Sequence, residues 1–143
     1  MLERLAVLFA LAAVVVLAVV LMRAWNARRL RGVLTASNAN ATPFWESLGE
    51  APDGRATLVM FSTPACAACH TAQAPAVRVV EQRLGASEVR VIRVDAAQRP
   101  EVARAFGVQT VPSTVVLAPA GRVVAVNQGF APSRRLVEQL QRA

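Results

Sequence analysis

The chain of 143 residues is unusually apolar, with 55% hydrophobic and 17% charged residues. Much of this excess lies in one stretch, because Leu5 to Met22 is eighteen consecutive residues without a charge. Without that stretch and its basic flank, about 100 residues remain, enough for one compact core and too few for two independent domains. Two cysteines exclude a disulfide-rich scaffold, and the apolar content excludes wholesale disorder.

The net charge of +7 is concentrated near the apolar stretch. Residues 1–40 hold five Arg against Glu3, a net charge of +4, whereas the much longer remainder contributes +3. No basic helix with interleaved aromatic side chains is present in the sequence. We therefore expect no nucleic-acid partner.

The apolar stretch predicts a membrane-spanning helix. Eighteen helical residues span about 27 Å, close to the roughly 30 Å thickness of a hydrocarbon core. A cleavable signal peptide is the alternative, but its apolar part is usually shorter and is followed by small residues at the cleavage site. Here Arg23, Trp25 and the basic run Arg28–Arg31 follow instead. We expect an uncleaved anchor over residues 1–31, with residues 5–22 in contact with lipid.

The distribution of arginines predicts the orientation of this anchor. Four Arg follow the span within nine residues, whereas Arg4 alone precedes it. By the positive-inside rule the C-terminal part lies in the cytoplasm, the extracytoplasmic side being the alternative. Residues 32–41 lack hydrophobic periodicity and predict a short flexible tether.

The remaining residues, 42–143, predict one α/β domain. Strands first alternate with helices and then end in a hairpin, which indicates a mixed central sheet with helices on both faces. The expected elements are a helix from Thr42 to Gly49, a strand over 55–61, a helix over 66–84, a strand over 89–94, a helix over 100–106, strands over 113–117 and 123–126, and a helix over 132–141.

The residues Cys66-Ala67-Ala68-Cys69 lie between a predicted strand and a predicted helix. Unpaired backbone N–H groups and the helix dipole at a helix start stabilise a thiolate, so the pKa of Cys66 is expected to fall below the usual value of about 8.5. Cys69 lies one turn further on and could attack a mixed disulfide formed at Cys66. This context favours thiol–disulfide exchange.

Two structural interpretations of the cysteine pair are weaker. These are the only cysteines, so an intramolecular disulfide must join Cys66 to Cys69, and such a short loop contributes little entropic stabilisation. A zinc site would need two further ligands, and the one histidine of the chain, His70, is the adjacent residue. We therefore expect no metal.

Residues 42–143 resemble the thioredoxin family, through several motifs in the family's order. The segment VMFSTPACAACH resembles the family's first core strand and active-site turn. Similar to its second half are Val94-Asp95, Arg99-Pro100, Phe106-Gly107-Val108, Thr110-Val111-Pro112-Ser113-Thr114, the hairpin turn Pro119 to Arg122, and Gly129. The resemblance implies the thioredoxin fold, preceded here by one transmembrane helix.

The resemblance also implies roles for individual residues. Pro112 matches the family's cis-proline, which faces the CXXC motif, and Val111 would present its backbone to an extended client segment. Ala65, Ala67 and Ala68 would complete the client-binding rim. The family works with a redox-active Cys66–Cys69 disulfide, without a cofactor, on protein disulfides or dithiols, and an unidentified reductase or membrane redox partner would regenerate it.

This chain departs from the family pattern near the cysteines. Ala65 replaces the Trp that usually precedes the first Cys, and Ser62 stands where another aromatic residue is common. Met60 and Val91 match the family's buried Asp and its Lys partner, so both members of that pair are apolar here. The group that usually helps to deprotonate the second thiol is therefore missing, and His70 is a candidate substitute, although adjacent helix positions diverge by about 100°.

Three other functions remain open. The motif C-A-A-C-H also fits covalent haem attachment, but the chain has no second His, and Met60 lies in a predicted buried strand. An outward-facing reductant of cytochrome c maturation shares the resemblance, although such proteins commonly carry an insertion that the short Cys69-to-Pro112 interval lacks. A tethered binding or scaffold module without turnover is the alternative from a different class.

Overall fold

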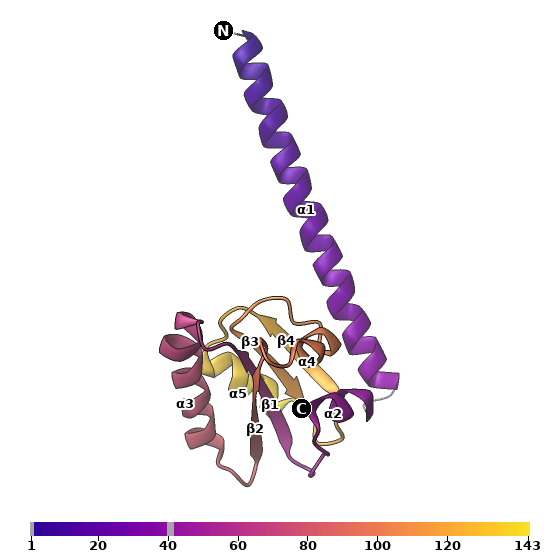
Figure 1. Cartoon of the computed structure of the whole chain (residues 1–143), viewed down its shortest axis with the longest axis vertical. Helices are drawn as coiled ribbons and strands as arrows, with labels where there is room; N and C mark the ends of the chain where they lie inside the picture. Colours follow the sequence, from indigo (N-terminus) through magenta and orange to yellow (C-terminus); the bar gives the residue numbers. More distant parts are fainter. Residues whose placement is uncertain (1, 40–41) are drawn as a thin grey trace. The chain divides into compact units, whose positions relative to one another are not determined.

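The computed structural model describes the backbone of residues 2–39 and 42–143, and the side chains of residues 9, 11–36, 42 and 44–143. The chain divides into two compact units, Met1–Gly32 and Val33–Ala143, which are described separately here. The first unit is helical, and the second contains the sheet (Figure 1).

The first unit belongs to α1, which runs from Leu2 to Ala39. Its described part, Leu11–Ala36, is long and apolar enough to cross a membrane, with a mean hydropathy of 1.7, although a signal sequence would meet the same criteria. The guanidinium of Arg29 lies 4.7 Å from the centre of the Trp25 ring, a cation–π contact. Both residue types are typical of the interface between membrane and water.

The sequence predicts a flexible tether over residues 32–41, whereas in the structure α1 continues as a helix to Ala39. Extending an existing helix costs far less free energy than nucleating one, so this segment needs no full apolar stripe to be helical. Val33 and Leu34 are half-buried and pack against apolar residues of the second unit, to which they belong. Residues 40 and 41 lie outside the described residues.

The second unit is built on a four-stranded sheet in the order β2-β1-β3-β4. Its strands are β1 (Ala56–Ser62), β2 (Val89–Asp95), β3 (Ser113–Leu117) and β4 (Val123–Gln128). β1 pairs with β2 in parallel, and the pairs β1/β3 and β3/β4 are antiparallel. The mixed sheet predicted from the sequence is confirmed.

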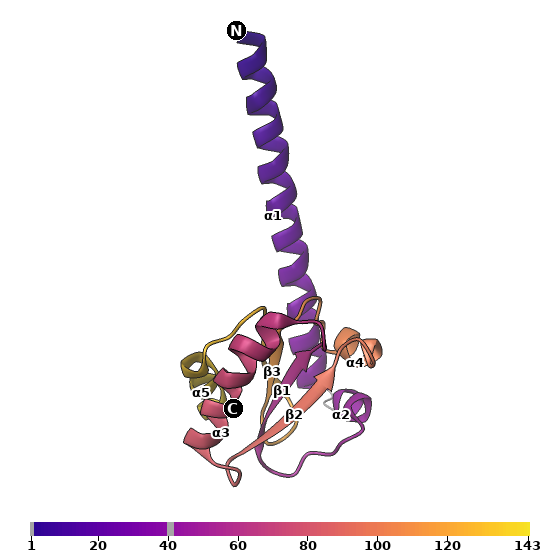
Figure 2. The same ribbon diagram turned by 60° about the vertical axis from the view of Figure 1, so that its left-hand side comes forward.

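Helices cover both faces of this sheet, as Figure 2 shows. The helices are α2 (Thr42–Leu48), α3 (Ala74–Leu84), α4 (Pro100–Ala105) and α5 (Ser133–Gln141). The pair α2 and α4 packs on one face and the pair α3 and α5 on the other. The order of elements agrees with the order expected for residues 42–143.

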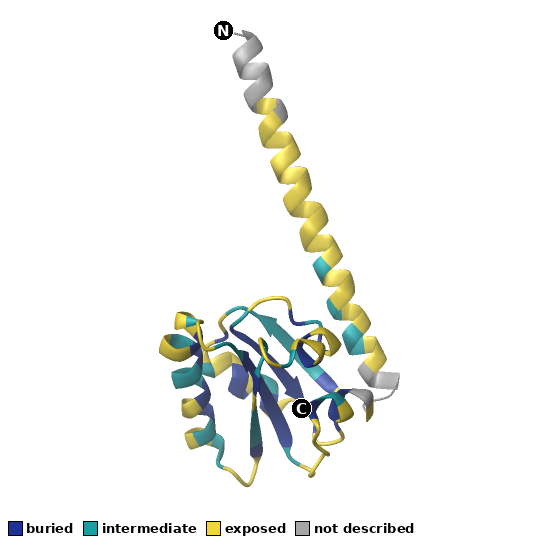
Figure 3. Ribbon diagram, viewed as in Figure 1, coloured by how far each residue is buried: buried dark blue, intermediate teal, exposed yellow. Residues whose placement is uncertain are grey.

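The central strand β1 explains why the sheet has two apolar faces. Six of its seven residues are buried (Figure 3). Val59 and Phe61 belong to the core cluster under α2 and α4, whereas Leu58 and Met60 belong to the cluster under α3 and α5. Successive side chains of a strand point to opposite faces, so one continuous apolar run supplies both cores.

The helix expected over residues 66–84 is interrupted near its start. Residues Cys69–Gln73 form a π-helical turn, in which the N–H of Ala74 donates to the carbonyl oxygen of Cys69, five residues back. Regular α-helix follows from Ala74 to Leu84. Such turns accommodate an extra residue in a helix and occur often at functional sites.

Candidate functional site

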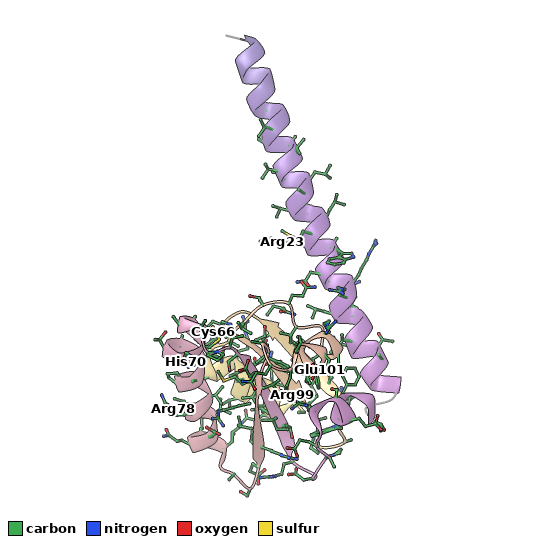
Figure 4. All side chains as sticks on the ribbon, in the orientation of Figure 1. Arg23, Cys66, His70, Arg78, Arg99 and Glu101 are labelled. Atoms are coloured by element: carbon green, nitrogen blue, oxygen red, sulfur yellow. A yellow bond between two sulfur atoms is a disulfide. The ribbon has the colours of Figure 1, made fainter. Side chains whose placement is uncertain are left out.

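Cys66 lies between the end of β1 and the first helical turn. The N–H of Cys66 donates to the carbonyl oxygen of Thr63 at 3.1 Å, which closes a tight turn after the strand, and the helical backbone begins at Ala67. Figure 4 shows Cys66 and His70 at the same end of the helix that continues as α3. The placement at a helix start agrees with the expectation from the sequence.

Cys66 and Cys69 form a disulfide with an S–S distance of 2.17 Å and a Cα–Cα distance of 5.3 Å. Their exposures differ: Cys66 is half-buried, whereas Cys69 is fully buried in the cluster under α3 and α5. An incoming disulfide can therefore reach the first sulfur more easily than the second. This asymmetry suits a pair with one attacking and one resolving thiol.

The backbone directs a donor toward the first sulfur. The N–H of Cys69 lies 3.1 Å from the Sγ atom of Cys66 and also 3.1 Å from its carbonyl oxygen. A hydrogen bond of this kind favours the charged form of the acceptor, in this case a thiolate. In the reduced protein, this backbone donor would favour a thiolate at Cys66.

The peptide bond between Val111 and Pro112 is cis, as the resemblance implied. Pro112 is buried directly before β3, whereas Val111 is half-buried and packs against both core clusters. Cys66 packs against the cluster that contains Cys69. The structure therefore brings the Val111–Pro112 segment and the cysteine pair to the same core cluster.

The rim around Cys66 is built of small side chains. Ala65, Ala67 and Ala68 are all exposed. Next to Val111 lies an open cleft of about 500 Å³, whose lining also includes Thr63, Ala103, Arg104 and Gln109. A client segment on this side of the site would therefore meet apolar groups together with Arg104 and Gln109.

The core beneath the cysteine pair is apolar. Met60 is 4% exposed and belongs to the same cluster as Cys69, and Val91 is half-buried against it. Two residues further along β2, Arg93 is exposed and pairs with Glu81 at 3.0 Å. The expectation that Met60 is buried is confirmed, and neither it nor Val91 is an ionisable group.

His70 turns toward the loop before Cys66. Its Nε2 atom lies 3.1 Å from the carbonyl oxygen of Pro64, and its side chain is exposed. A carbonyl only accepts hydrogen bonds, so Nε2 carries the proton in this arrangement. The buried Cys69 is thus not the partner of this ring nitrogen.

Two buried or half-buried glutamines near the site were not anticipated from the sequence. Gln73 is fully buried and bonds to the backbone of Ala131. Gln128 donates from Nε2 to the carbonyl oxygen of Gly107 at 2.8 Å, and its Oε1 accepts from the Ser113 hydroxyl at 3.2 Å. The sequence does carry a signal for the burial of Gln73. It lies at helical spacing before the buried Val77 and Val80, and a polar side chain on a buried helix face needs hydrogen-bond partners.

No group of three or more potential metal-binding side chains occurs among the described residues. Away from the cysteines, the pKa of Asp53 is lowered, first because the Arg55 side chain donates to its carboxylate. This pair lies in the loop before β1 and is partly exposed to solvent.

Comparisons with known proteins agree with the geometry of the site. Residues 50–141 match the family described as "TraF: F plasmid transfer operon protein". The thioredoxin of Bacillus subtilis (strain 168) is 31% identical over 81 residues, which are 57% of this chain and 75% of that protein.

Solved structures give the same result for the fold. The X-ray structure of Fasciola hepatica thioredoxin is 29% identical, covers 62% of this chain and 81% of its own, and has a TM-score of 0.53. A thioredoxin variant from Halobacterium salinarum NRC-1 is 23% identical, with coverages of 64% and 76% and a TM-score of 0.56. The chain therefore belongs to the thioredoxin-like TraF family, and it is a thiol–disulfide oxidoreductase with a CXXC cysteine pair.

Proposed function

We propose that this protein is a membrane-tethered oxidoreductase that reduces or exchanges protein disulfides, with Cys66 as the nucleophile and Cys69 as the resolving thiol. The observation that carries the proposal is the asymmetry of the pair. Cys66 is half-buried and receives the Cys69 N–H at 3.1 Å, whereas the Cys69 side chain is fully buried. The first sulfur can thus be reached as a thiolate, and the second is held in place behind it.

The reaction has two balanced steps. The Cys66 thiolate attacks one sulfur of the client disulfide, the client S–S bond breaks, and the released client thiolate takes up a proton. Cys69 then loses its proton to solvent and attacks Cys66, which forms the Cys66–Cys69 disulfide and expels the second client thiol. Two electrons pass from the protein to the client, and a dithiol or membrane-bound reductant must restore them. The same steps in reverse oxidise a client dithiol.

The Val111–Pro112 segment supports the docking of an extended client. The pairing of β3 with β1 begins at Ser113, directly after the cis Val111–Pro112 bond, and Val111 packs beside the cluster that carries the cysteines. The exposed Ala65, Ala67 and Ala68 would form the opposite rim. Because these side chains are small, we expect backbone pairing to contribute more to client binding than rim contacts do.

The apolar Met60 and Val91 affect the resolving step. A buried Asp at position 60 without a Lys at position 91 would lower stability strongly. Because both residues of the family's Asp–Lys pair are apolar here, no buried charge is left unpaired. Deprotonation of Cys69 then relies on water that reaches the site once the mixed disulfide has formed, since His70 Nε2 is directed to Pro64. We therefore expect the second step to depend more on pH than the first.

The N-terminal helix supports tethering to a membrane. Its described part has the length and hydropathy of a single span, and four Arg follow the apolar stretch. We infer that the helix is retained, that residues 5–22 contact lipid, and that residues 42–143 face the cytoplasm. A domain held within a few nanometres of the bilayer meets membrane-protein clients or a membrane redox partner at a raised local concentration.

Two measurements test the proposed function. The reduced protein should reduce insulin disulfides, and Cys66→Ser should abolish this turnover. The reduction potential of the pair then sets the direction: a value near about −270 mV indicates a reductant, and one near about −120 mV an oxidant. Absence of turnover, together with a client retained by Cys66→Ser, would favour a scaffold role and contradict the proposal.

A further inference from the structure

The open cleft beside Val111 has one ionisable side chain among its lining residues, that of Arg104 in α4. The other lining residues are alanines, valines, threonines, a proline and a glutamine, none of which carries a charge. A charged group of an incoming client would therefore meet a charge of one sign in this cleft. That sign is positive.

The cleft adjoins the turn that carries the reacting cysteine. Thr63 lines the cleft, and its carbonyl oxygen accepts the N–H of Cys66 at 3.1 Å. Val111 lines the cleft at another point, and both Val111 and Cys66 pack against the cluster that contains Cys69. A client segment that lies along Val111 with its cysteine at Cys66 therefore lies beside the cleft.

The loop between α4 and β3, which forms one wall of the cleft, is held by Gln128 of β4. The Nε2 atom of Gln128 donates to the carbonyl oxygen of Gly107 at 2.8 Å. Its Oε1 atom accepts from the N–H of Gln109 at 3.2 Å and from the Ser113 hydroxyl at 3.2 Å. Because three hydrogen bonds already fix this loop, little of it has to be ordered when a client binds.

Arg104 is exposed, and it takes part in none of the ion pairs among the described side chains. Its Nε atom donates to the carbonyl oxygen of Pro100 at 3.1 Å, one turn earlier in α4, which orients the planar guanidinium. Its two Nη groups donate to no acceptor in the described part of the chain. They can therefore bind a carboxylate from outside through two parallel hydrogen bonds.

The two acidic residues nearest to Arg104 in the sequence have other partners. Glu101, three residues earlier in α4, lies 3.8 Å from the Nε atom of Arg99. The carboxylate of Asp95 accepts from two backbone N–H groups in the turn after β2. Among the described residues, no carboxylate lies within ion-pair distance of Arg104, so the charge of the cleft is not neutralised by the protein itself.

We propose that Arg104 is a specificity-determining residue, which binds an Asp or Glu side chain close in sequence to the reacting cysteine of the client. This inference rests on the proposed function, because it requires a client disulfide at Cys66. The occupant of the cleft is an acidic segment of a client polypeptide, since Arg104 would repel a basic one. The pair is open to solvent, so its effect is a modest selection among clients.

The test measures the attack of Cys66 on peptide disulfides by the full chain in a nonionic detergent. A Cys69→Ser background stops the reaction at the mixed disulfide. A single Glu is moved along the peptide on both sides of the cysteine, and each peptide has a Gln counterpart. At one or more positions the Glu peptide should react about two- to fivefold faster than its Gln counterpart at low ionic strength. This ratio should approach one at about 1 M salt, which screens exposed charges.

Variants of Arg104 identify the side chain that causes the preference. Arg104→Gln should bring the ratio of the Glu rate to the Gln rate close to one, and Arg104→Glu should bring it below one. Arg104→Lys should keep a smaller preference, because the charge remains and the two-pronged geometry is lost. Any general change in the reactivity of Cys66 cancels in this ratio.

Arg78→Glu is the matched control, because it makes the same change of charge elsewhere on the surface. Arg78 is an exposed residue of α3, and it does not line the cleft. Figure 4 shows it well to the side of Glu101 in α4. Arg78→Glu should leave the ratio unchanged.

The outcomes that would overturn the inference differ from failure of the proposed function. A ratio near one at every peptide position, a preference that survives Arg104→Gln, or an equal loss of preference in Arg78→Glu would each contradict the role of Arg104. A Cys66 that reacts with none of the peptides, and not with hydroxyethyl disulfide either, would instead contradict the proposed function itself.

Discussion

The backbone N–H of Cys69 points at the sulfur of Cys66 from 3.1 Å, while the Cys69 side chain is itself fully buried. One residue therefore provides a donor to the sulfur of its neighbour and, in the proposed reaction, the thiol that displaces the client. This relationship depends on the helical turn between the two residues, and the intervening Ala67 and Ala68 leave it open to solvent.

The first prediction concerns the reactivity of the two thiols. In the reduced protein, Cys66 should react with iodoacetamide at least about tenfold faster than Cys69 near neutral pH, because it is accessible and its thiolate is stabilised. Mass spectrometry of peptides from a time course measures both rates. Cys66→Ser and Cys69→Ser give each rate in isolation, and equal rates would contradict the assigned roles.

The second prediction concerns the apolar core beneath the pair. Met60→Asp should lower the free energy of unfolding by several kcal/mol, at least about 3, because it buries a carboxylate without a cationic partner. Met60→Leu, of similar volume, should cost less than about 1.5 kcal/mol. Urea unfolding of the full chain in detergent measures both, and an unchanged midpoint for Met60→Asp would show that the β1 register is wrong.

Much of this fold could be predicted from local sequence. The apolar run of β1, the glycines that end α2 and α3, and the hairpin between β3 and β4 each carry a local signal, and the structure confirms all of them. The cysteine pair was also recognisable, because its chemistry depends on a strand-to-helix context that the sequence displays. The cis bond before Pro112 followed from the resemblance.

The features that sequence reasoning missed depend on contacts between distant segments. The partner of Gln73 is 58 residues away, and no local pattern identifies Ala131 as that partner. The helix over residues 32–39 has no apolar stripe that would predict it, because it forms by extending an existing helix. Among its described side chains, Val33 and Leu34 pack against the core. The π-helical turn after Cys69 likewise has no apolar signature of its own.

The third prediction concerns the pH dependence of stability. The pKa of Asp53 is lowered from 3.8, first by the hydrogen bond from the Arg55 side chain. A group with a lowered folded pKa stabilises the fold above its unfolded pKa, and this contribution disappears as the pH falls through the folded value. Asp53→Asn should therefore be less stable than wild type near neutral pH and equally stable in strong acid.

Unfolding midpoints of both proteins, followed from neutral to acidic pH, measure that difference. Both side chains are accessible to solvent at the surface, so the difference should also shrink at high salt, where the Debye length falls to about 3 Å. A difference that persists unchanged in strong acid would assign the effect to something other than the charge of Asp53.

The fourth prediction concerns the membrane side. A reporter fused after Ala143 should be found in the cytoplasm, because four Arg follow the span and one precedes it. Replacing Arg28, Arg29 and Arg31 with neutral residues should weaken or invert this orientation. A reporter found outside would place the cysteine pair in an oxidising compartment, where it would need electrons from across the membrane.

The last prediction tests the assigned roles of the two cysteines on clients. Cys69→Ser should accumulate mixed disulfides between Cys66 and client proteins in cells, because the resolving thiol is missing and the first step still occurs. Cys66→Ser, its matched control, should accumulate few, since the remaining Cys69 is fully buried. Non-reducing gels followed by mass spectrometry identify the linked cysteine and the client.

This trapping comparison is the most direct test of the central claim, that Cys66 attacks protein disulfides and Cys69 resolves the product. The account predicts reduction-sensitive client adducts through Cys66 in Cys69→Ser and their near absence in Cys66→Ser. Adducts in neither variant, or equal amounts in both, would contradict it.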